Sequence, residues 1–145
     1  MMKLMIHEVL KKAHGAKTKA AKIKILKENN TQALRTLFIL NFDESVKTRI
    51  PEGDVPYKPN EAPQGTEHNM LEHEAKKLYY YVKGGADNLP QLRIETMYIQ
   101  LLEGLYKDEA EVLVHCFNRD LHKHYRITHA VVKEAFPEIV WGNRS

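Results

Sequence analysis

The sequence has 145 residues, a length typical of a single domain that buries a hydrophobic core without cross-links. Hydrophobic residues make up 43% and charged residues 28%, which excludes a disordered chain, and no apolar run approaches the ~18–20 residues of a membrane-spanning helix. The one cysteine, Cys116, excludes an internal disulfide and any CxxC motif, so we expect a cytoplasmic protein.

The net charge of +3 is unevenly distributed. Residues 1–27 contain eight lysines and one acid, Glu8, and therefore carry +7, whereas the other 118 residues carry −4. A basic segment on a near-neutral body is typical of a protein that binds a polyanion. A solvated, lysine-rich surface would give the same count, and charge alone does not separate the two.

Three helices are predicted in the first 42 residues, over 2–15, 18–28 and 32–42. The first has an amphipathic stripe that stops at Gly15. Thr18 is the predicted N-cap of the second, whose apolar residues spread around the helix and define no clear packing face. Thr31 caps the third, which is apolar nearly all round and is predicted to be a central buried element.

Residues 43–69 show no helical pattern. Four prolines (51, 56, 59 and 63) and two glycines (53 and 65) fall in this stretch, which is therefore predicted to be a long irregular loop. A loop of this length in a compact domain is usually functional or partly disordered.

Four further helices are predicted, over 70–82, 90–105, 108–121 and 128–137. In the first, the apolar stripe places Tyr79 in the core with Tyr80 or Tyr81 exposed, and Gly84-Gly85 follow as a C-cap. Pro90 opens the second, and Asp108 with Glu111 resembles a capping box for the third. The whole chain, 1–145, is predicted to be one all-α domain of about seven helices.

No catalytic motif stands out. Four histidines lie close in sequence (115, 122, 124 and 129), but none forms the i, i+4 pair of an HExxH zinc site, so we expect exposed or phosphate-facing histidines and no metal. Cys116 lies among apolar residues of a predicted helix, where a thiol packs as a small hydrophobe. GxGxxG, GxxxxGK[ST] and GxSxG are absent, so neither an enzyme nor a cofactor is predicted.

Two basic segments are the candidate binding residues. The first is the turn and helix start at residues 15–19, followed by further lysines; a helix N-terminus with adjacent lysines suits phosphate. The second, residues 119–128, joins two helices, and an ordinary charged turn is its simpler interpretation. The candidate nucleic-acid-binding residues are Lys17, Thr18, Lys19, Lys22, Lys24, Arg119, His122, Lys123, Tyr125, Arg126, Thr128 and Lys133.

The order of these segments resembles the N-terminal DNA-binding domain of phage-type ATP-dependent DNA ligases. The likeness lies in residues 4–28, in TQALRTLFILNF at 31–42 with the Pro-rich loop after it, and in NRDL at 118–121 followed by VKEAFPEIV at 132–140. The resemblance implies an all-helical domain that grips duplex DNA around a nick through backbone and minor-groove contacts. It assigns Arg119, the turn at 123–128 and Lys17–Lys19 to the DNA-facing surface, and more weakly Lys47, Arg49 and Lys58 in the loop.

Two departures limit that resemblance. The glycine of the family's turn after R/K-D-L is replaced by His124, Tyr125 or Arg126, which changes the local contact expected with DNA. The KxDG motif, which carries the adenylated lysine of ligases, is absent. We therefore expect a stand-alone, non-catalytic version of the domain, encoded by a phage and located in the host cytoplasm.

The leading hypothesis is thus largely sequence-independent binding of duplex DNA, with a preference for nicked or distorted sites. The alternative is a protein-interaction module on the same scaffold: an inhibitor or adaptor of a host or phage enzyme, or a homo-oligomer. The long loop, the Tyr79-Tyr80-Tyr81 run and the missing turn glycine favour this second hypothesis.

Overall fold

The structure, a computed structural model, describes residues 4–53, 55–62 and 69–144. Within these residues it contains eight α-helices, one 3-10 helix (η1) and no strand beyond two isolated bridges. The elements are α1 (Ile6–Gly15), α2 (Lys19–Glu28), α3 (Gln32–Phe42), α4 (Leu71–Glu74), η1 (Ala75–Tyr81), α5 (Gln91–Gly104), α6 (Lys107–Phe117), α7 (Leu121–Tyr125) and α8 (His129–Ala135). The all-α class is confirmed.

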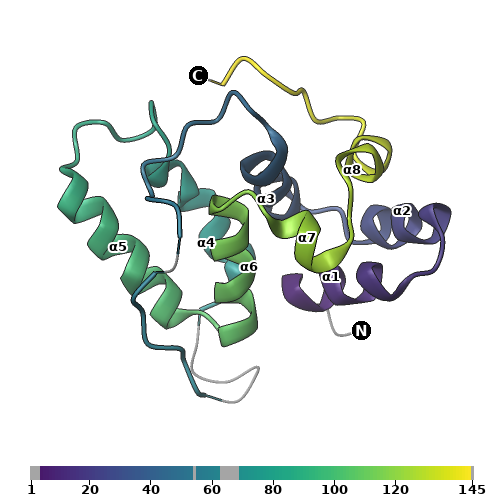
Figure 1. Cartoon of the computed structure of the whole chain (residues 1–145), viewed down its shortest axis with the longest axis horizontal. Helices are drawn as coiled ribbons and strands as arrows, with labels where there is room; N and C mark the ends of the chain where they lie inside the picture. The colour runs from purple at the N-terminus through teal and green to yellow at the C-terminus, as the bar shows by residue number, and fades with distance from the viewer. Residues whose placement is uncertain (1–3, 54, 63–68, 145) are drawn as a thin grey trace.

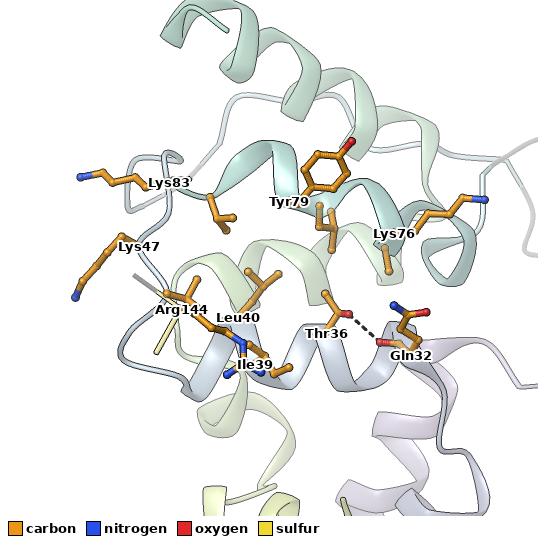
Figure 2. A pocket seen from close by; sticks show the side chains of 13 residues that line it. Gln32, Thr36, Ile39, Leu40, Lys47, Lys76, Tyr79, Lys83 and Arg144 are labelled. Atoms are coloured by element: carbon orange, nitrogen blue, oxygen red, sulfur yellow. Dashed lines mark hydrogen bonds between the residues drawn. The ribbon is translucent and has the colours of Figure 1, made fainter. Parts of the chain in front are cut away.

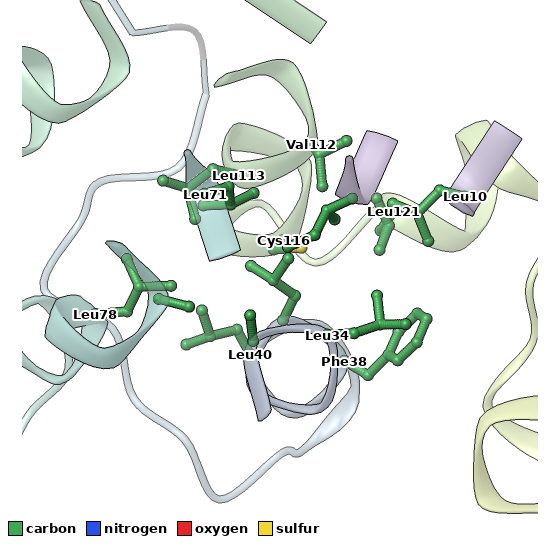
Figure 3. Close-up of a cluster of buried hydrophobic side chains, with 14 of the residues drawn as sticks. Leu10, Leu34, Phe38, Leu40, Leu71, Leu78, Val112, Leu113, Cys116 and Leu121 are labelled. Carbon is green, nitrogen blue, oxygen red and sulfur yellow. The ribbon is translucent and has the colours of Figure 1, made fainter. Parts of the chain in front are cut away.

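The central element is α3, which packs against α4, η1 and α6. Leu34, Leu37 and Phe38 on this helix are buried almost completely, and burying one such side chain contributes about 1.5–3 kcal/mol. Leu40 extends the buried surface toward Leu78 of η1, on the other side of the helix (Figure 3). The prediction that residues 32–42 form a central buried helix is confirmed.

Two groups of helices flank α3 (Figure 1). At one end α5 packs against α6 and η1; at the other, α1 packs against α2, α6 and α7, and α8 lies on α2. The second group comes from both ends of the sequence. Its packing decides which basic residues share a surface.

The prediction of one α-helix over 70–82 is wrong beyond residue 74. After one α-helical turn the chain winds as a 3-10 helix, and the residues that it buries are spaced by three: Ala75, Leu78 and Tyr81. Tyr81 is therefore the core tyrosine, at 4% exposure, while Tyr79 is 49% exposed, the reverse of the prediction. The end of η1 pairs with the loop: the Tyr81 carbonyl accepts from the Arg49 N–H, and Lys83 donates to the Lys47 carbonyl.

The helix predicted over 108–121 ends at Phe117 as α6, and a separate helix, α7, occupies residues 121–125 in the segment predicted to be a turn. At the end of α6, the N–H of Arg119 bonds to the Cys116 carbonyl and that of Asp120 to the His115 carbonyl, the hydrogen-bond pattern of a Schellman motif. Arg119 takes the left-handed conformation (φ 59°) that glycine usually takes there, so no sequence signal marked the break. The additional helix α7, and the division of 70–82 into α4 and η1, raise the count in the described residues from about seven helices to eight α-helices and η1.

The capping box predicted from Asp108 and Glu111 is also wrong. Helix α6 begins one residue earlier, after Tyr106, and no side chain caps it. Asp108 instead pairs with Lys11 of α1, 2.9 Å away.

The described parts of the 43–69 loop are irregular, as predicted. Pro63 and Gly65 lie outside the described residues, as do Met2 and the start of the first predicted helix. Arg49 ties the loop to the body because its guanidinium donates to the carbonyls of Ala86 (3.0 Å) and Leu89 (2.7 Å). In the described part of the chain, no helix is both long and apolar enough to cross a membrane.

Candidate nucleic-acid interface

The first basic segment forms the α1–α2 turn and the start of α2. Thr18 is the N-cap, as predicted, and its hydroxyl accepts a hydrogen bond from the Ala21 N–H at 3.1 Å. Lys17, Thr18 and Lys19 are exposed. Only Leu26 of α2 is buried, so most side chains of this helix are at least partly exposed.

Three lysines of this segment are partly engaged within the protein. Lys22 Nζ donates to the Ala13 carbonyl (3.0 Å) and so caps the C-terminus of α1. Lys19 pairs with Glu134 of α8 at 2.9 Å, and Lys24 lies 4.0 Å from Glu28. Exposed pairs of this kind contribute little to stability, so these ammonium groups are readily available to a phosphate.

The second basic segment comprises α7 and the turn into α8. Lys123 and Arg126 are exposed, and Arg126 ends α7 in the left-handed conformation (φ 50°). Thr128, the first residue of the helix predicted over 128–137, caps α8, because its hydroxyl accepts from the Val131 N–H. Within the described residues, Lys17, Lys123 and Arg126 have no ion-pair partner.

The tertiary structure brings these two segments to one end of the molecule. The rings of His14, at the end of α1, and Tyr125, at the end of α7, meet edge to face with centroids 6.3 Å apart. The pair lies beside both turns: Lys17 follows His14 by three residues and Arg126 follows Tyr125 directly. In Figure 1, α7 lies over α1, with α2 and α8 beside them.

Two of the predicted site residues, Arg119 and His122, are engaged within the protein and are less suited to a ligand. Arg119 is half-buried, and its guanidinium donates to the Leu40 carbonyl at the end of α3, 3.1 Å away. His122 packs on the Phe42 ring (5.6 Å) and lies 3.4 Å from the Asn41 amide nitrogen. Lys133 is exposed on α8 and lies near His129, whose pKa is lowered first by burial and then by the Lys133 charge.

A second basic surface lies between α3 and η1, and among its cations the sequence indicated only Lys47, as a weaker candidate. A groove of about 290 Å³ there has an apolar floor that includes Ile39 and Leu40. Its lining also includes Tyr79, Lys47, Lys76, Lys83 and Arg144; in Figure 2 the Tyr79 ring points away from Ile39 and Leu40, and the Lys76 and Lys83 side chains point outward. Tyr79 also contacts the Tyr80 ring, with centroids 4.4 Å apart. We call these residues the Tyr79 groove.

Residues 9–123 match a protein family described as a family of unknown function (DUF6433). The chain belongs to this family. The DUF6433 match includes α1 through the first residues of α7, and so takes in the α1–α2 turn and Lys123. No curated protein and no solved structure matches the chain. The resemblance to DNA ligases therefore stays a prediction.

Proposed function

We propose that this DUF6433 protein binds duplex DNA through its phosphate backbone, without catalysis and largely without reading sequence. The observation that carries the proposal is the His14–Tyr125 contact, which puts the α1–α2 turn and the α7–α8 turn side by side. Lys17, Lys123 and Arg126 thereby lie at one end of the molecule, although Lys17 precedes the other two by about a hundred residues in sequence.

The chemistry of this end suits phosphate more than base edges. Lysine and arginine side chains, a threonine hydroxyl at Thr18 and the free N–H groups at the start of α2 are the usual phosphate-contacting groups. The ligase resemblance also implies a preference for nicked or distorted duplexes. That resemblance, and a phage origin, remain part of the proposal.

The test is binding to an intact and a nicked duplex of the same sequence across a salt series. Log K should fall linearly with log salt, because binding releases counterions from the phosphates. Replacing Lys17, Lys123 and Arg126 together by alanine should weaken binding to every sequence equally and reduce the slope by up to about 3.

A matched control replaces Lys47, Lys76 and Lys83 of the Tyr79 groove by alanine. This variant loses the same number of positive charges but from another surface. It should therefore retain DNA binding if the interface lies at the α1–α2 and α7–α8 turns. Undetectable binding to both duplexes at low salt would overturn the proposal, whereas equal losses in the two triple variants would overturn the location only.

The Tyr79 groove favours a second candidate function, the docking of a protein segment that carries acidic residues. An apolar floor beside an exposed aromatic ring, with three lysines around it, is complementary to a short acidic and apolar peptide. The two triple variants also separate this function from DNA binding. In nuclease-treated lysate, a true partner would be captured by the wild type and by the Lys17/Lys123/Arg126 variant, and lost with the groove variant and with Tyr79→Ala.

A further inference from the structure

Two histidines and one aspartate meet where α6 passes into α7. His115 Nδ1 lies 3.0 Å from Asp120 Oδ1, and His124 Nε2 lies 3.8 Å from Asp120 Oδ2. The two imidazole rings are stacked, with centroids 3.6 Å apart. One potential ligand atom from each residue lies within 4.8 Å of the other two.

The Schellman motif at the end of α6 creates this arrangement. It reverses the chain within residues 118–120, so His115 in the last turn of α6 comes beside Asp120, the N-cap of α7. Asp120 and His124 are then four residues apart on the same face of α7. No metal signature is visible in the sequence, because the i, i+4 pair is an aspartate with a histidine and because no glycine marks the end of α6.

We propose that His115, Asp120 and His124 form a binding site for a transition-metal dication such as Zn²⁺. Imidazole nitrogen and carboxylate oxygen are common zinc ligands at about 2.0–2.2 Å, which places ligand atoms in a tetrahedral site about 3.4 Å apart. The separations from the two imidazole nitrogens to the Asp120 oxygens, 3.0 and 3.8 Å, bracket that value, and the stacked rings would have to turn apart so that both nitrogens point at one ion. Three protein ligands leave the fourth position for water or a ligand oxygen.

The neighbouring histidine is not part of the site. His122 packs on Phe42 and approaches Asn41, on the side of α7 that faces α3. His124 is 48% exposed and His115 and Asp120 are partly exposed, so an ion has access from solvent. Binding would fasten α6 to α7 across the left-handed Arg119 and should stabilise the fold.

The experiment is calorimetric titration of the full chain, free of any affinity tag, with ZnCl₂, supported by Co²⁺ absorption spectra. We expect one ion per chain, d–d bands of a low-coordinate Co²⁺ site, and a Tm that rises in stoichiometric Zn²⁺. His115→Gln, Asp120→Asn and His124→Gln should each weaken binding at least tenfold and abolish the rise in Tm. His122→Gln and His73→Gln are matched controls that should leave binding unchanged.

His124 is exposed, so His124→Gln tests the site without threatening the fold, and circular dichroism checks that each variant remains helical. The proposal is overturned if the wild type takes up no stoichiometric ion, or if His124→Gln binds as the wild type does. These outcomes do not depend on the DNA proposal, because neither readout includes nucleic acid.

Discussion

Glu109 Oε2 accepts a hydrogen bond from the backbone N–H of Ile6, 3.1 Å away, although 103 residues separate the two in sequence. The other carboxylate oxygen accepts from the Leu71 N–H at 2.9 Å. Ile6 and Leu71 are the first residues of α1 and α4, where backbone N–H groups lack an intrahelical partner and a negative charge is favourable. One fully buried carboxylate in α6 therefore caps two other helices.

Glu109→Gln should destabilise the protein by about 2 kcal/mol, because hydrogen bonds to a charged group are strong and the new amide NH₂ would face one of the two N–H donors. Urea denaturation measures the loss. Glu111→Gln, an exposed change on the same helix, should cost less than about 0.5 kcal/mol. Equal midpoints for the two variants would contradict the capping role.

Asp43 fixes the C-terminal segment and makes stability depend on pH. Burial alone would raise the pKa of this carboxyl, but hydrogen bonds from Ser45, the Gly142 N–H and Arg144 outweigh it and lower the pKa to about 2. The unfolded value is about 3.9, so the contribution, on the order of 2 kcal/mol, is complete above that pH and is lost as the pH falls toward 2.

Asp43→Asn should therefore be less stable than the wild type at pH 6, and the gap should narrow between about pH 4 and pH 2 as the wild-type carboxyl becomes protonated. Urea midpoints measured across this range test the prediction. A gap that is constant with pH would show that the carboxylate charge is not what holds residues 142–144.

Arg119 and Arg126 both have left-handed backbones, but their side chains differ in role. Arg126→Gly should stabilise the protein by about 1 kcal/mol, because glycine adopts that conformation without strain. Arg119→Gly removes the same backbone strain but also removes the hydrogen bond to the Leu40 carbonyl. Its net effect on the free energy of unfolding should therefore be near zero. Thermal melts compare the two, and DNA binding should weaken mainly in Arg126→Gly.

Gly85 is required by a close approach of the chain to itself. A Cβ atom at this position would lie 1.9 Å from the Tyr79 carbonyl oxygen, so Gly85→Ala should push the turn away from η1 and lower the Tm by roughly 4–8 °C. Gly15→Ala is the control: its Cβ would meet nothing within 4 Å, and alanine favours the helix. An unchanged Tm in Gly85→Ala would show that the turn can move away from Tyr79 without loss of stability.

Sequence reasoning succeeded where the deciding interaction is local. Thr18, Thr31 and Thr128 each cap a helix within three residues of themselves, so those helix starts were predictable. The bounds of α3 and the irregular course of the loop followed from apolar periodicity and proline content for the same reason.

The tertiary structure decided the rest. Residues 75–81 wind as a 3-10 helix where their end pairs with the 47–49 segment, and Arg119 reverses the chain without the glycine that would have signalled it. The sequence by itself determined the all-α class, the three threonine caps and the two basic segments. Only the packing of α1 against α7 put those segments at one end, and only the turn after α6 joined His115 to Asp120, because both depend on contacts between residues that periodicity and capping signals do not relate.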